Sequence, residues 1–365
     1  FAGVTINGSG ATFAQPLIDS CKADYATASG NTVNYSGGGS GKGRTDFSGG
    51  LVDFAGSDAP YASGEPKNLV YAPVYAAPIS VMYNIPGIKE PIYLSPSTIA
   101  KIFSGYITNW DDKQIAADNN RTVKTPVFAT KKVSVKVKGK MTTKVVPVLD
   151  KTGKPTVKSY KSTPVTINLP KSQITVWYRT DSSGTSQNFT NFLNGTAPED
   201  WKKAGNAVFA NSTPRNIATQ FNFQGASGSA AVAAGVKSKE GSIGYGEPSF
   251  AIANSLQTAY VQNAAGEFVA PEAAGVSAFL GGSTINDNGT VSYAYTKSIP
   301  GAYPIGVTSY GLAYASGKDA DKQKAVADWF TFVLTQCPTK YPEKGFSLIT
   351  GPLADKAKAQ IALIK

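Results

Sequence analysis

At 365 residues the chain is longer than one ordinary domain of about 100 to 200 residues, so two domains are expected. Histidine is absent and cysteine occurs only at Cys21 and Cys337, which excludes Ser-His-Asp and Cys-His catalysis and a Cys/His zinc site. The formal charge of +11 is concentrated, because eleven lysines and one acid between Lys131 and Lys171 carry +10 and leave +1 elsewhere. That segment has no arginine and one aromatic residue, Tyr160, so we expect no nucleic-acid partner.

The first part of the chain alternates between predicted strands and helices. Apolar residues recur every four positions from Phe13 to Tyr25, as one face of a helix requires. A second helix is expected from about Lys42. Short strands are predicted at residues 4–7, 32–36 and 51–55. This alternation implies a mostly parallel sheet whose ligands lie at the carboxyl ends of the strands.

The middle of the chain predicts a second α/β unit. We expect one lobe to contain residues 1–82 and 303–365 and a second lobe to contain residues 83–302. A hinge is expected where the chain crosses between them, at Ala77–Tyr83 and Tyr303–Val307. The further predicted elements are a helix at 96–103, a strand at 174–179, a helix ending near 192, a strand at 242–246 and an apolar helix at 325–335.

The lysine-rich segment has its own pattern. Val133, Val135 and Val137 alternate with polar residues, which is typical of a half-exposed strand, and residues 150–155 read as a turn. We interpret residues at about 128–171 as a β-hairpin-like insertion of two or three strands in the second lobe, with a solvated charged face. A functional alternative, in which the positive field attracts anions or an acidic cell surface, stays open.

Three loops share one design, in which a strand ends, small residues follow and a helix begins. They are Gly10–Phe13, Gly39–Gly41 and Asp181–Thr185. Free backbone N–H groups and the positive end of the helix dipole make such starts natural anion sites. Each loop alone is more often a turn with a helix cap, but three of them in one two-domain chain favour an anionic ligand.

Several of these segments match a known family. The chain resembles the periplasmic-type phosphate-binding proteins of bacterial ABC transporters, and its Ile6-Asn7-Gly8 start is similar to the DING branch, although Ser9 interrupts the glycine run. The resemblance implies a two-lobed periplasmic-binding-protein fold of type II that binds inorganic phosphate in its cleft and delivers it to a membrane permease. The matching motifs are Gly8–Phe13, Asn34-Tyr35 ahead of Ser40, Val52–Pro60 and Arg179–Thr185.

The same resemblance assigns roles to residues. Thr12 and Phe13 would bind phosphate through backbone N–H groups, while Arg179 would clasp two ligand oxygens and be held by Asp181. Asp58 would accept a hydrogen bond from a proton of phosphate, which sulfate lacks at neutral pH. The predicted phosphate ligands are Thr12, Phe13, Ser40, Asp58, Arg179, Ser183, Gly184 and Thr185, with Asp181 in support.

The remaining expectations concern partners and surroundings. We expect a monomer with no cofactor and no metal, located outside the cytoplasm, and with any membrane anchor lying outside this chain; a start at Phe1 fits a mature exported protein. Cys21 and Cys337 both fall in the first lobe, where a disulfide and two separate buried thiols are equally compatible with the sequence. Two other functions are kept as alternatives: a phosphate-ester hydrolase, and a surface-adhesion protein that uses the basic hairpin.

Overall fold

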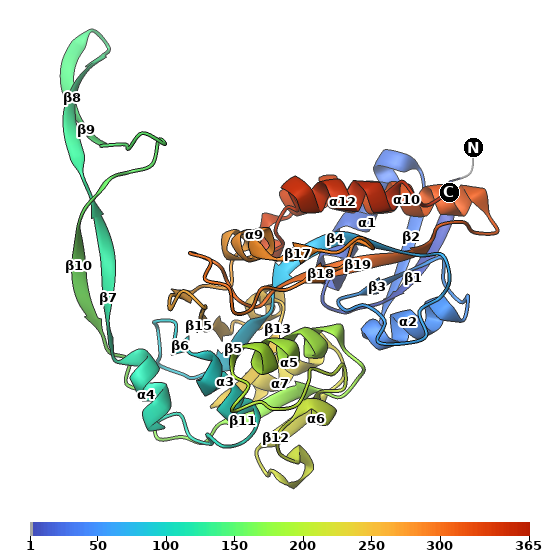
Figure 1. Ribbon diagram of the computed structural model, residues 1–365, viewed down its shortest axis with the longest axis horizontal. Coiled ribbons are helices and arrows are strands. Elements are labelled where there is room, and N and C mark those ends of the chain that lie inside the picture. Colours follow the sequence, from blue (N-terminus) through green and yellow to red (C-terminus); the bar gives the residue numbers. More distant parts are fainter. Residues whose placement is uncertain (1–2) are drawn as a thin grey trace.

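The computed structural model describes residues 3–365, which form two five-stranded sheets connected by crossing strands (Figure 1). The first sheet has the order β2-β1-β3-β19-β4; β1 is parallel to β2 and β3, and β19 is antiparallel to β3 and β4. Its strands are β1 (Thr5–Gly10), β2 (Thr32–Gly37), β3 (Phe54–Ser57), β4 (Leu69–Pro78) and β19 (Gly306–Tyr314).

Helices from both ends of the chain cover this first sheet, with α1, α10 and α12 above it and α2 below it in Figure 1. The helices are α1 (Gln15–Ser29), α2 (Ser40–Ser48), α10 (Ala320–Thr335), α11 (Cys337–Lys340) and α12 (Gly351–Ile361), with a 3₁₀ turn at Pro342–Lys344. A disulfide joins Cys21 of α1 to Cys337 of α11, with 5.8 Å between their Cα atoms. The disulfide therefore links the N-terminal part of the chain to its C-terminal part.

Two local predictions for this sheet were misplaced. The third strand was expected at residues 51–55, but β3 covers Phe54–Ser57 and Leu51 is 74% exposed. An exposed leucine in the loop after α2 imitates the first apolar residue of a strand, which periodicity cannot distinguish from a buried one. Similarly, α2 begins at Ser40 rather than near Lys42, so the predicted loop serine opens the helix.

The second sheet has the order β12-β11-β13-β5-β14. Neighbouring residues of β13 face opposite sides, because Gly244 lies under Val232 and Val236 of α7 while the Tyr245 ring stacks on Phe189 of α5. The strands are β5 (Ser80–Asn84), β11 (Thr175–Arg179), β12 (Phe223–Ala226), β13 (Ser242–Gly246) and β14 (Gln257–Thr258). The helices are α3 (Pro96–Phe103), α4 (Lys113–Asn119), α5 (Gly184–Thr196), α6 (Phe209–Ser212), α7 (Ser229–Ser238) and α8 (Pro248–Ala253), with a 3₁₀ turn at Ile217–Thr219.

Two segments cross between the sheets side by side. Ile79, between β4 and β5, donates its backbone N–H to the carbonyl of Ile305 at 2.8 Å, and the Tyr303 hydroxyl donates to the carbonyl of Ile79 at 2.7 Å. These are the segments predicted to form the hinge. The residues from α9 (Ala273–Gly282) onward already contact β4 and β19, so the lobe boundaries at 82/83 and 302/303 stay a prediction. The small strands of this region are β6 (Tyr93–Leu94), β15 (Tyr260–Gln262), β16 (Phe268–Val269), β17 (Thr284–Ile285) and β18 (Val291–Ser292).

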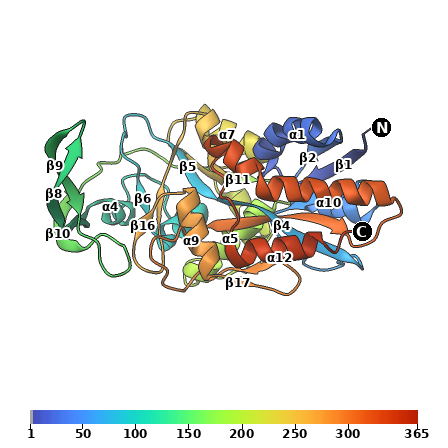
Figure 2. The same ribbon diagram turned by 90° about the horizontal axis from the view of Figure 1, so that it is seen from above.

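The lysine-rich insertion is a long arm, residues Arg121–Val165, that projects from the end of the molecule opposite the chain termini (Figures 1 and 2). It contains four strands rather than the predicted two or three: β7 (Arg121–Phe128), β8 (Thr130–Val137), β9 (Lys140–Pro147) and β10 (Val157–Val165). β7 pairs with β10 near the body, and β8 pairs with β9 further out. The inner strands β7 and β10 contain Pro126 and Pro164, which argue against a strand in the sequence. Proline is tolerated here because each strand of a two-stranded ladder has an unpaired edge. Among the helices within residues 3–365, none is both long enough and apolar enough to cross a bilayer.

Candidate functional site

Loops from the carboxyl ends of β1, β2 and β3 meet loops from β11 and β12 across the gap between the sheets. The Thr12 hydroxyl lies 3.0 Å from the Ser229 hydroxyl, and Gly41 donates its N–H to the carbonyl of Ser182 at 2.9 Å. The Thr185 hydroxyl donates to a carboxylate oxygen of Asp58 at 3.3 Å. Segments more than a hundred residues apart in the chain therefore share one small region, as expected for strand ends that face each other.

Arg179 ends β11 and is fixed on three sides. Its Nε donates to Asp181 Oδ1 at 2.7 Å, Nη2 pairs with Asp181 Oδ2, and Nη1 donates to the Ser229 hydroxyl at 3.0 Å. The side chain is 2% exposed, and Gly228 at the start of α7 donates its N–H to the same carboxylate at 3.0 Å. Burial, the largest single influence, raises the pKa of Asp181, but the Arg179 hydrogen bonds, the Arg179 charge and the Gly228 N–H together outweigh it and hold that pKa below the ordinary value. The result is a preorganised planar cation.

Asp58 follows β3 and is buried, with 2% of its surface exposed. Its Oδ1 accepts the Ser309 hydroxyl at 2.7 Å, and its Oδ2 accepts the Thr185 hydroxyl. Burial raises the pKa of this carboxyl, and the Ser309 hydrogen bond and the Arg179 charge offset part of the rise. Each carboxylate oxygen has two lone-pair directions, so both oxygens can still accept a hydrogen bond from a ligand O–H.

The serines and threonines of the predicted site line the helix starts. Ser40 opens α2 and its hydroxyl accepts the Asp58 N–H at 3.0 Å, which ties the loop after β2 to the loop after β3. Ser183 is the cap residue of α5, and its hydroxyl accepts the Ser186 N–H at 3.1 Å. Thr185 lies in the first turn of the same helix and is 1% exposed. Phe13 is fully buried in the core beside Phe346, so only its backbone is available to a ligand.

Glycines allow the loops of the two sheets to touch. A Cβ atom on Gly184 would lie 2.4 Å from the Ser40 hydroxyl and 2.8 Å from Asp58 Cβ. On Gly39, whose φ of +92° suits glycine, a Cβ atom would lie 2.4 Å from an oxygen of Asp181. Direct contacts or a shared neighbour, Ser229, thus connect the predicted residues of separate loops, and at Gly39 and Gly184 there is no room for a larger side chain.

Sequence reasoning missed two polar residues of this region. Ser229 contacts both Thr12 and Arg179, and the Gly228-Ser229 start of α7 repeats the strand, small-residue loop and helix design of the predicted loops. The sequence therefore contains a fourth loop of this design at residues 226–229. Ser309 lies within the buried strand β19 and donates to Asp58; no local pattern distinguishes it from any other strand serine.

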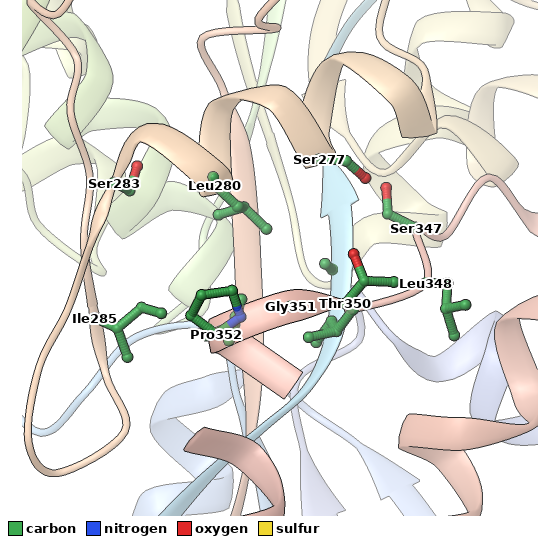
Figure 3. Close-up of a pocket in the computed structure, with 13 residues that line it drawn as sticks. Ser277, Leu280, Ser283, Ile285, Ser347, Leu348, Thr350, Gly351 and Pro352 are labelled. Carbon is green, nitrogen blue, oxygen red and sulfur yellow. The ribbon is translucent and has the colours of Figure 1, made fainter. Parts of the chain in front are cut away.

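Two hollows border this region, and a third lies away from it. One hollow beside Asp58 is bordered by Asn188 and Tyr293, and another is bordered by Thr12 and Ser229. A separate pocket between α9 and the segment that leads into α12 contains none of the predicted phosphate ligands (Figure 3). Within residues 3–365 there is no group of three or more Cys, Asp or Glu side chains that could hold a metal ion.

Comparison with known proteins identifies the family. Residues 2–334 match the model of the PBP superfamily domain. The chain is 31% identical over 338 residues to phosphate-binding protein PstS 3 of Mycobacterium leprae, covering 88% of this chain and 76% of that protein. It is 29% identical over 331 residues to phosphate-binding protein PstS of Xylella fastidiosa, covering 90% and 76%. The chain belongs to the PstS family of the PBP superfamily.

The structure agrees with this assignment. It superimposes with a TM-score of 0.68 on a high-affinity periplasmic phosphate-binding protein, PfluDING, solved with bound phosphate; the sequences are 21% identical, and the match covers 98% of this chain and 93% of the other. The predicted two-lobed binding-protein fold and the predicted resemblance to PstS-like and DING proteins are confirmed. Both PstS relatives are binding proteins by name.

Proposed function

We propose that this protein binds inorganic phosphate between its two sheets and delivers it to the permease of an ABC transporter. The proposal rests on family membership and on the geometry of the five loops. Arg179 offers a guanidinium to two phosphate oxygens, and the starts of α2 and α5 offer N–H groups. The residues assigned to phosphate are Thr12, Phe13, Ser40, Asp58, Arg179, Ser183, Gly184 and Thr185; Asp181 holds Arg179 in place, and Ser229 is added as a second support.

The observation that carries the proposal is the burial of Asp58 among hydroxyls and opposite a fixed cation. A buried carboxylate repels an anion unless that anion brings a proton to share. Phosphate at neutral pH carries at least one proton and can donate it to Asp58, whereas sulfate carries none. The arrangement around Asp58 therefore favours a protonated tetrahedral oxyanion over an unprotonated one.

Replacing Asp58 with asparagine tests this role. We expect Asp58→Asn to bind phosphate less tightly relative to sulfate, because the amide can donate to sulfate and no longer requires a proton. Leaving a buried polar group unmatched costs on the order of 1–3 kcal/mol, so the ratio of the two affinities should fall by about tenfold or more. Isothermal titration calorimetry of both anions measures that ratio.

A matched control separates this effect from a general change of charge. Asp328 pairs with Lys324 on the exposed face of α10, so Asp328→Asn removes one carboxylate outside the site and should leave selectivity unchanged. Burial raises the pKa of Asp58, so this carboxylate is protonated at a higher pH than an exposed aspartate. As the pH falls, Asp58 should therefore lose its acceptor role before an exposed aspartate would. An Asp58→Asn protein that discriminates phosphate from sulfate like the wild type contradicts the assignment.

The location and the catalytic inactivity of the chain are part of the proposal. We infer that it works as a monomer outside the cytoplasmic membrane, where a solute-binding subunit meets its permease. Binding rather than hydrolysis is inferred because the site presents donors and the carboxylates of Asp58 and Asp181, but neither a histidine base nor a metal cluster in the described part of the chain. Turnover of a phosphomonoester by the purified protein, with and without added divalent metal, decides against this inference.

A further inference from the structure

The arm, Arg121–Val165, holds the whole net charge of the protein. It contains twelve lysines and arginines and one acid, whereas the rest of the chain has 23 basic and 23 acidic residues. The outer ribbon, β8 and β9 with their turn (residues 130–147), has six lysines and no acid. The body is therefore neutral overall, and the outer ribbon is uniformly cationic.

The charges of the arm are not used inside the protein. None of the ion pairs within residues 3–365 includes a lysine of the arm. The single acid, Asp150, is engaged in its own turn, where it accepts the N–H groups of Thr152 at 2.8 Å and Lys154 at 3.0 Å. Every lysine of the outer ribbon thus remains available to a partner.

Apolar side chains are exposed among these lysines. Val137, Met141 and Val145 are 52%, 66% and 58% exposed, and all three lie on the outer ribbon. The register places Met141 opposite Lys136 and Val137 opposite Lys140, so cationic and apolar groups sit side by side at the tip. Exposed apolar side chains that gather within a rim of charged residues are typical of a surface that contacts a protein or a membrane.

The arm is firmly seated on the body. The Arg121 guanidinium lies 3.5 Å from the centre of the Tyr93 ring and 3.8 Å from that of Phe268, and it donates to the Asp118 carbonyl at 2.8 Å. Further out, Val148 donates its N–H to Ala129 at 2.8 Å, which joins the inner and outer ribbons. At roughly 3.3 Å per residue, an eight-residue ribbon spans about 26 Å, so the tip stands well clear of the site.

We propose that the outer ribbon binds the surface of an anionic phospholipid membrane. Its lysines contact headgroup phosphates, and Met141 and Val137 enter the boundary between headgroups and acyl chains. Nucleic acid is disfavoured because the outer ribbon has no arginine and no aromatic residue. A second copy is disfavoured by like charge, and a soluble polyanion does not explain the exposed apolar groups.

Vesicle binding tests the proposal with the full-length protein. We expect it to sediment with vesicles of phosphatidylcholine mixed with phosphatidylglycerol and not with phosphatidylcholine alone, and to be released by salt. Changing four lysines of the outer ribbon to glutamine should weaken binding by about tenfold or more. Val137→Ser combined with Met141→Ser should weaken it by roughly threefold or more without any change of charge. The four lysines are Lys132, Lys136, Lys138 and Lys140.

Matched controls make the outcomes decisive. Glutamine at the exposed body lysines Lys202, Lys203, Lys237 and Lys239 removes the same charge and should leave vesicle binding unchanged. Phosphate affinity, measured for every variant, reports that the fold is intact. The proposal is overturned if the wild-type protein does not sediment with anionic vesicles. It is equally overturned by a double serine variant that binds them normally while soluble poly(glycerol phosphate) or DNA displaces the protein, since the ribbon would then be a general polyanion binder.

Discussion

The candidate phosphate site and the outer ribbon of the arm use charge in opposite ways. In the site, Arg179 and Asp58 are each 2% exposed and every charged oxygen or nitrogen has a defined partner. On the ribbon, six lysines point into solvent without partners. Buried charge acts through individual geometry, whereas exposed charge acts through the summed field and is screened by salt. A single substitution in the candidate phosphate site should therefore have a large effect on binding, whereas the effects of lysine substitutions on the outer ribbon should be small and additive.

The contrast between buried and exposed charge should be largest for two carboxyl groups, the buried Glu247 and the exposed Asp150 of the arm. Glu247 follows β13, is fully buried and accepts the Ser249 N–H at 2.9 Å at the start of α8. Burial raises its pKa from 4.5 to about 8. The native protein thus keeps Glu247 protonated at pH values where the unfolded chain ionises it. Stability from this residue is full below the unfolded pKa, falls as pH rises above it, and is lost through the folded pKa.

We expect Glu247→Gln to flatten this pH dependence. The free energy of unfolding of the wild type should fall relative to the variant from about pH 5 to about pH 8, by at most roughly 5 kcal/mol for a shift of that size. Urea denaturation at several pH values measures it. Asp150→Asn is the exposed counterpart: the Thr152 hydrogen bond lowers the pKa of Asp150, so its removal should leave the wild-type slope near neutral pH unchanged. Parallel curves for the wild type and Glu247→Gln would contradict the assignment.

The site and the tip of the arm also differ in the room that they leave for an added side chain. A Cβ atom on Gly184 meets Ser40 and Asp58 across the gap between the sheets, whereas one on Gly139 at the tip of the arm meets nothing within 4 Å. Gly184→Ala keeps a helix-compatible backbone, so its effect should come from the crowded contact between the loops. Overpacking of this kind costs about 1–3 kcal/mol, which predicts roughly ten- to hundredfold weaker phosphate binding by calorimetry.

A helical glycine elsewhere supplies the control for this prediction. Gly281 lies near the end of α9, where an added Cβ atom would meet nothing within 4 Å. Gly281→Ala should leave phosphate affinity unchanged and raise stability slightly, because alanine restricts the unfolded chain. Equal phosphate affinities for both alanine variants would show that the loops of the two sheets do not need to approach this closely when phosphate binds.

The sequence predicted more of the site than of the arm for a physical reason. Helix starts after small-residue turns leave a local signature, so the loops around Ser40 and Gly184 were found from the chain alone. The helix at Pro96–Phe103 was also predicted, and it begins with a serine cap followed by proline. Ser309 was not, because its approach to Asp58 depends on strand pairing between residues far apart in sequence. The predicted insertion of two or three strands began at about residue 128, so it left out β7, where Pro126 lies in the strand; a two-stranded ladder tolerates proline at an unpaired edge.

Removing the outer ribbon should have the smallest effect on the site. Because Val148 donates to Ala129 at 2.8 Å, residues 130–147 can be replaced by a short Asn-Gly turn without moving the inner ribbon. We expect phosphate affinity to stay within about twofold of the wild type, since the eight-residue inner ribbon, about 26 Å long, holds the deleted lysines about three Debye lengths of about 8 Å from the body. Calorimetry with phosphate, at low and at physiological salt, measures this.

A large loss of affinity at both salt concentrations would mean that the ribbon contributes to the site itself, and the separation of buried and exposed charge into two functions would not hold. A loss confined to low salt would instead identify the ribbon as a long-range attractor of the anion, which changes how phosphate reaches the cleft but not how it is held there.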